Sequence, residues 1–208
     1  MAVSIPIFGL SPNACDTLLS TLSLRDLFGV LLISKRANEL VKNYIHNRQA
    51  TLRVVIGSSP TVELEDSEGD KLKWSFYHER KPERFELKDF ELRILKISKE
   101  NNNEKEMSID FREMSPGIYG CQLDSMDTVL QFIEYIADLF KATVSFLCVR
   151  NSKLDDLEAI QSIKVLRKSP IVETTTKCAS EENIRRVLDG FKAREQLNIV
   201  CYSDWDWQ

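Results

Sequence analysis

Side chains that could carry out chemistry are few in this chain, and none has the spacing of a known catalytic or metal site. Only two histidines occur, His46 and His78, and neither stands at metal-ligand spacing from the other or from a cysteine. The chain lacks the Gly-x-Ser-x-Gly turn of a serine hydrolase and the glycine-rich loops that hold phosphates. An enzyme with an unfamiliar site would need a pocket with convergent polar groups. The sequence therefore predicts a binding protein that is not an enzyme, with no metal and no cofactor.

Composition points to a soluble globular protein. The 208 residues are 43% hydrophobic and 29% charged, and the net charge of -4 gives no reason to expect a nucleic-acid or anionic-membrane partner. We expect neither a secretion signal nor a membrane-spanning segment. The five cysteines are an odd number and form no Cys-x-x-Cys pair. This pattern predicts a reducing compartment, the cytoplasm or the nucleus.

The first forty-odd residues predict three short helices. Ser11 can cap the first helix, with Pro12 at its first position, and Ser23 followed by Asp26 resembles a capping box that starts a second. The segment 34–45 carries apolar residues at helical spacing and predicts a third. These helices hold more leucine than they can bury among themselves. They either cap the rest of this chain or leave an apolar face for a partner.

The order and spacing of these residues resemble an F-box over roughly residues 4–45. The resemblance rests on four features: Leu-Ser-Pro near the start, a leucine pair in the first helix, a Leu-x-x-x-Asp-Leu motif, and Ser34-Lys35-Arg36 at the end of the pattern. Two features depart from the family: the Pro of the usual Leu-Pro pair is displaced by one residue, and Ala37 and Asn38 stand where the family has a Trp. The family implies docking on the Skp adaptor of a cullin–RING ubiquitin ligase. The resemblance assigns this contact to a set of apolar residues: Pro6, Leu10, Pro12, Leu18, Leu19, Leu22, Leu24, Leu27, Phe28 and Leu31.

The middle of the chain switches to period-two alternation, which is typical of strands. Segments 51–57, 61–66 and 71–77 predict a three-stranded antiparallel meander, and 85–98 predicts one or two more strands before a polar loop at 99–106. Trp74 and Tyr77 are expected to pack on one face of this sheet. An F-box followed by such strands resembles the expanded nematode-type F-box proteins with an F-box-associated type 2 domain. The chain is short for that family, which would leave part of the associated domain absent.

The C-terminal half alternates helix and strand. Helical patterns at 126–140, 155–163 and 180–191 alternate with apolar strands at 142–150, 171–178 and 197–202. Short helix-then-strand units require parallel strands. The strand centres recur every 25 to 28 residues or so, which predicts a degenerate leucine-rich-repeat-like domain. A plain open α/β domain without true repeats is the alternative.

The expected fold class is therefore α/β, with an F-box module at 1–47 and a target-binding domain at 48–208. The tail after Cys201 carries Tyr202, Trp205 and Trp207, which either cap the last strand or contact the target.

The resemblance implies a substrate-recognition subunit of an SCF-type ubiquitin ligase that marks a target for degradation. Families of this type are suspected of acting on foreign or selfish proteins, including as antidotes to toxins. The alternative is a stoichiometric inhibitor or scaffold whose helices merely cap its own domain.

Overall fold

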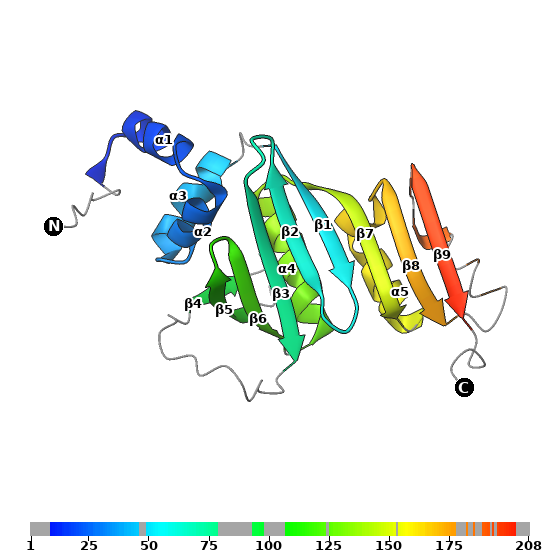
Figure 1. Ribbon diagram of the computed structural model, residues 1–208. Coiled ribbons are helices and arrows are strands. Elements are labelled where there is room, and N and C mark those ends of the chain that lie inside the picture. Colours follow the sequence, from blue (N-terminus) through cyan, green and yellow to red (C-terminus); the bar gives the residue numbers. More distant parts are fainter. Residues whose placement is uncertain are drawn as a thin grey trace.

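The computed structural model describes residues 9–45, 49–78, 93–97, 107–123, 125–152, 154–177, 182, 185, 189–191, 193 and 195–202. Within these residues the chain is a mixed α/β protein. Three helices at the start precede a single nine-stranded sheet, and three further helices lie among its later strands. Figure 1 shows the N-terminal helices at one end of the sheet and the last strand at the other.

The N-terminal helices begin where the sequence predicts caps. They are α1 (Pro12–Ser20), α2 (Leu24–Leu31) and α3 (Lys35–Ile45). The Ser11 hydroxyl accepts a hydrogen bond from the Ala14 N–H at 3.4 Å. The Ser23 hydroxyl accepts from the Asp26 N–H at 3.1 Å and donates to the Asp26 carboxylate at 2.7 Å. Each cap pairs a backbone N–H that the first helical turn leaves without an internal partner.

All strands of the described residues join one sheet, in the order β4-β5-β6-β3-β2-β1-β7-β8-β9. The strands are β1 (Ala50–Ile56), β2 (Thr61–Asp66), β3 (Lys71–His78), β4 (Arg93–Ile97), β5 (Met107–Ser115), β6 (Ile118–Leu123), β7 (Thr143–Ser152), β8 (Ile171–Lys177) and β9 (Gln196–Tyr202). The antiparallel meander β1-β2-β3 is confirmed, as is the parallel pairing of β7, β8 and β9.

Two sequence expectations about this sheet need correction. The antiparallel and parallel halves were expected as successive parts, but β1 pairs with β7 in parallel and unites them. The hairpin of β5 and β6 was not predicted, and β6 adds to β3 in parallel. The predicted loop at 99–106 and most of the predicted helix at 180–191 lie outside the described residues.

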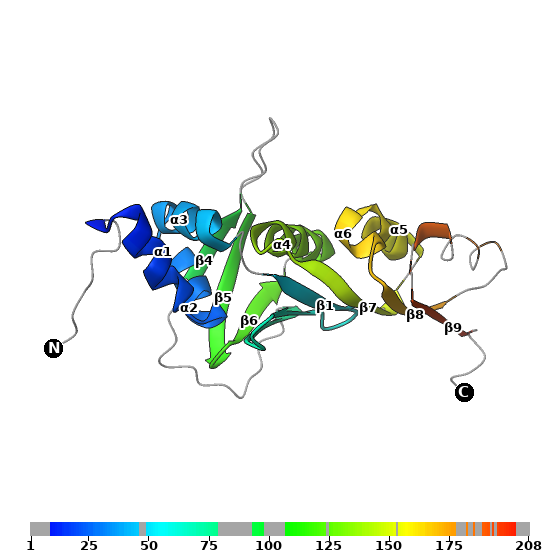
Figure 2. The same cartoon turned by 90° about the horizontal axis from the view of Figure 1, so that it is seen from above.

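Helices cover one face of the parallel half of the sheet. These are α4 (Met126–Leu139), α5 (Leu154–Ser162) and α6 (Lys164–Arg167). Figure 2 shows all three on the same side of β1, β7, β8 and β9, with no described helix on the opposite side. The alternation of buried and exposed residues along β1 and β2 fits this one-sided cover.

The buried side chains form one hydrophobic cluster that runs from the N-terminal helices into the sheet. At its centre, the Phe28 ring contacts Trp74 and Tyr119 edge-on, with centroids 5.1 and 5.0 Å apart, and Trp74 contacts Phe132 of α4 at 5.2 Å. The expected boundary near residue 47 thus marks a change from helix to strand, while the core continues across it.

Trp74 and Tyr77 were expected on one face of the sheet, and this expectation is wrong. Trp74 is fully buried, whereas Tyr77 is 38% exposed. Residues three apart on a strand point to opposite faces, because strand side chains alternate with period two. Tyr77 therefore lies on the face that the helices leave uncovered.

Candidate functional site

The structure encloses half of the residues that the F-box resemblance assigns to the adaptor contact. These residues have 0–2% of their surface exposed and belong to the chain's own core: Leu19, Leu24, Leu27, Phe28 and Leu31. The idea that all of these side chains are surplus to the chain's interior is therefore wrong. The helix α2 packs on α3 and on the sheet, where Phe28 contacts Trp74 and Tyr119.

The remaining assigned residues keep part of their surface open. Leu10, Leu18 and Leu22 are half-buried and Pro12 is exposed, while Pro6 lies outside the described residues. Most of this open surface lies on or beside α1. Just after α2, Ile33 is 70% exposed, and it directly precedes the Ser34-Lys35-Arg36 segment of the F-box-like pattern.

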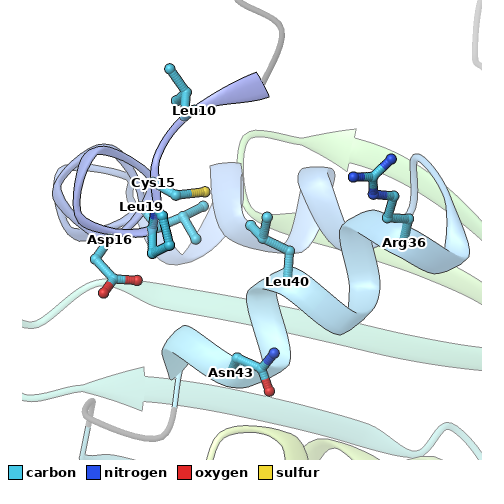
Figure 3. Close-up of a pocket in the computed structure, with 8 residues that line it drawn as sticks. Leu10, Cys15, Asp16, Leu19, Arg36, Leu40 and Asn43 are labelled. Atoms are coloured by element: carbon cyan, nitrogen blue, oxygen red, sulfur yellow. The ribbon is translucent and has the colours of Figure 1, made fainter. Parts of the chain in front are cut away.

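A pocket of about 420 Å³ lies between α1 and α3. Figure 3 shows Leu40 of α3 pointing toward Cys15 and Leu19 of α1, with Leu10 above them. Polar side chains stand around this apolar floor. The lining residues are Leu10, Pro12, Cys15, Asp16, Leu19, Arg36, Leu40 and Asn43. Three of the residues assigned to the adaptor contact therefore meet at one site.

Several lining residues were missed by the sequence assignment. Leu40 was recognised only as part of the apolar stripe of the third helix, and Arg36 only as part of the Ser-Lys-Arg close. Asp16 and Asn43 carried no signal, because exposed polar residues on two helices show no sequence relation until the helices pack. The spacing of Leu40 within the stripe is the signal that could have found it.

The pocket does not contain an activated thiol. Loss of hydration in this apolar setting raises the pKa of Cys15, and the negative charge of Asp16 raises it further. The thiol therefore stays protonated near neutral pH, whereas a cysteine nucleophile needs a depressed pKa. The described residues contain no group of three or more His, Cys, Asp or Glu side chains placed to hold a metal ion. In the same part of the chain, no helix is both long and apolar enough to cross a membrane.

Contacts from α2 and α3 hold the pocket in a fixed position on the sheet. The Leu24 N–H donates to the Asp70 carboxylate at 3.4 Å, linking the start of α2 to the β2–β3 turn. The Asn38 amide donates to the Tyr135 hydroxyl at 3.0 Å, linking α3 to α4. Together with the Phe28–Trp74 contact, these bonds make the helices and the sheet one packed body.

The described residue among those predicted to contact a target lies at the opposite end of the sheet from α1. Tyr202 is the last residue of β9, and Trp205 and Trp207 lie outside the described residues. The target prediction therefore stays a prediction. In Figure 1, the strand that Tyr202 terminates forms the edge of the sheet furthest from α1.

No protein-family model, no curated protein and no solved structure matches the chain. The described elements define the chain only as a mixed α/β protein with three helices at its N-terminal end. The F-box assignment rests on the residues of α1, α2 and α3 alone and is taken up below as a proposal.

Proposed function

We propose that this chain is a non-catalytic adaptor that docks on the Skp subunit of a cullin–RING ubiquitin ligase through the α1–α3 pocket. The observation that supports the proposal is the meeting of Leu10, Pro12 and Leu19, from the start of the F-box-like pattern, in one open pocket. Apolar floors with a polar rim are typical of sites that receive side chains from a partner helix.

In this proposal the sheet domain, interpreted as a degenerate leucine-rich-repeat-like unit, holds a target protein. Catalysis belongs to other subunits, and this chain raises the effective concentration of target lysines near the transferred ubiquitin. A continuous core supports such a role, because a target held on the sheet keeps a constant position relative to the docked adaptor.

Binding of the full chain to purified Skp adaptor tests the proposal. We expect Leu10→Asp and Leu40→Asp, both at half-buried residues that line the pocket, each to weaken binding by about tenfold or more, since a charge would be placed in an apolar contact. Val200→Asp is the matched control: it alters an exposed apolar residue on β9, the edge strand far from α1, and should change affinity by less than about twofold. Circular dichroism establishes that each variant is folded.

A second candidate function is a stoichiometric inhibitor or scaffold without ligase recruitment. It is favoured by the burial of Leu24, Leu27 and Leu31 in the chain's own core, as expected if the helices only cap the domain. If the parent chain fails to bind the Skp adaptor, this candidate replaces the first. In cells, loss of an adaptor raises the abundance of its target, whereas loss of an inhibitor raises only the target's activity.

A further inference from the structure

The two edges of the sheet differ in how they are protected against further strand pairing. The edge strand β4 has five residues, two of which, Arg93 and Lys96, are charged. The edge strand β9 has seven residues, QLNIVCY, with neither charge nor proline. Its pairing with β8 is continuous over all seven residues without a bulge. Charges, prolines, bulges and short length are the features that normally prevent an edge from pairing, and β9 has none of them.

The hydrogen bonds at the start of β9 show which backbone groups face the open edge. The Glu195 and Gln196 N–H groups both donate to the Pro170 carbonyl, at 3.0 and 3.1 Å. Glu195 precedes the strand, and Gln196 is the first residue of β9, so within the strand the Gln196 N–H points toward β8. Successive N–H groups of a strand point to alternate sides. The N–H groups of Leu197, Ile199 and Cys201 therefore point away from β8, and no described strand lies beyond them.

The side chains of β9 also alternate in a way that specifies what could pair with it. Leu197 and Ile199 pack against the core on the helix-covered side but are only half-buried. On the opposite side, Gln196 and Asn198 are exposed and Val200 is 58% exposed. An added strand would complete the cover of Leu197 and Ile199 if its own apolar residues faced the helix side.

We propose that the open edge of β9 binds an extended segment of a partner protein, which adds to the sheet as a further strand. The segment has apolar residues at alternate positions, facing the helix side next to Leu197 and Ile199, and polar residues between them. Main-chain hydrogen bonds supply affinity in this mode of recognition, and the alternate side chains supply specificity. This inference deepens the target-holding part of the proposed function but does not require docking on the Skp adaptor.

A second copy of the chain is a poorer occupant. A strand of seven residues is roughly 23 Å long. Pairing two such edges covers far less than the roughly 1,200–2,000 Å² that stable protein–protein interfaces bury. A peptide segment needs only the length of the edge itself.

The test uses the full chain and a synthetic peptide in which valine and threonine alternate between two terminal lysines. Amide hydrogen exchange is followed by nuclear magnetic resonance with and without a saturating amount of the peptide. We expect exchange at Leu197, Ile199 and Cys201 to slow by about tenfold or more, since their N–H groups acquire partners. Asn198 and Val200, whose N–H groups face β8, should change little.

Two matched variants and one modified peptide distinguish edge pairing from other binding. Ile199→Pro removes an N–H at the open edge, whereas Ile199→Ala removes side-chain volume but keeps that N–H. The peptide should protect the Leu197 and Cys201 amides in Ile199→Ala and fail to do so in Ile199→Pro. A peptide N-methylated along one edge should fail with the parent chain, a result that does not depend on the folding of any variant.

Lack of protection at these amides in the parent chain would overturn the proposal. Protection that rises with protein concentration in the absence of peptide would also overturn it, because the occupant would then be a second copy. The adaptor is absent from this experiment, so its outcome is independent of the Skp-binding test.

Discussion

The helix α1 carries two leucines and α2 carries three, and the two helices use them differently. Every leucine of α2 is buried, in a helix that packs on α3 and the sheet, and Phe28 lies at the centre of the aromatic cluster. In α1, Leu19 is buried at the floor of the pocket between α1 and α3, whereas Leu18 stays half-exposed. The difference teaches that leucine spacing specifies an apolar face without specifying what covers it. In this protein the apolar face of α2 is enclosed by the core, whereas part of the apolar surface of α1 stays open.

The largest expected effect is that of Phe28→Ala, which tests whether α2 belongs to the core. Removing a fully buried ring that contacts Trp74 and Tyr119 should lower the free energy of unfolding by about 3–5 kcal/mol. Urea denaturation followed by tryptophan fluorescence measures this change. A loss below about 1 kcal/mol would mean that α2 packs only loosely on the sheet.

A paired comparison of leucines sharpens the contrast between the two helices. Leu27→Ala creates a cavity at a fully buried position and should cost about 2–5 kcal/mol of unfolding free energy. Leu18→Ala removes a half-exposed side chain and should cost less than about 1 kcal/mol. Equal losses in the two variants, measured by the same urea titration, would remove the distinction between α1 and α2.

The third test concerns α3, which is joined to α4 through Asn38 and Tyr135. Tyr135→Phe removes the hydroxyl that accepts the Asn38 bond at 3.0 Å, and should cost about 0.5–1.5 kcal/mol at neutral pH. Burial raises the pKa of Tyr135 above its ordinary value of 10.0. The hydrogen bond with Asn38 lowers this pKa, whereas the negative charge of Glu39 raises it further.

The raised pKa of Tyr135 gives this contact a pH signature. The folded state favours the protonated phenol of Tyr135. The stability that this group contributes is therefore fully present below pH 10 and is lost as the pH rises above 10 through the folded-state pKa. The unfolding free energy of the parent should therefore fall above pH 10 more steeply than that of Tyr135→Phe. Parallel curves for the two proteins, from urea titrations at pH 8 to 11, would contradict the assignment.

The smallest expected effect belongs to the uncovered face of the sheet. Lys71 lies 3.1 Å from Glu65 and 3.9 Å from Glu63, but its side chain is 54% exposed. Water and salt screen such a pair, so Lys71→Met should change the unfolding free energy by less than about 0.5 kcal/mol. Thermal denaturation at low and high salt measures the difference. A larger, salt-sensitive loss would show that this face contributes to stability as the helix-covered face does.

Local features of the fold were predictable because they depend on neighbours in the sequence. The caps at Ser11 and Ser23 involve residues three positions apart. The β1–β2–β3 meander follows from alternating patterns joined by short turns, and the parallel order of β7, β8 and β9 follows from the helices between them. Each of these features is specified within a few dozen residues.

The candidate site was predictable only in part. Leu10, Pro12 and Leu19 were assigned from the F-box-like pattern, but their meeting with Leu40 and Asn43 depends on how α1 packs on α3. The burial of Leu24, Leu27 and Leu31 depends on strands and a helix that follow much later in the chain. Apolar spacing is the same whether the covering surface comes from this chain or from another.

The sequence by itself determined the caps of α1 and α2, the strands of the β1–β2–β3 meander and the strands β7, β8 and β9, because capping and periodicity act over a few residues. Only the tertiary structure decided that β1 and β7 join two halves into one sheet, that the core includes α2, and that β9 is an edge strand among the described residues. The physical reason is that burial and strand pairing require only complementary surfaces. A local sequence pattern does not specify which distant segment provides the complementary surface.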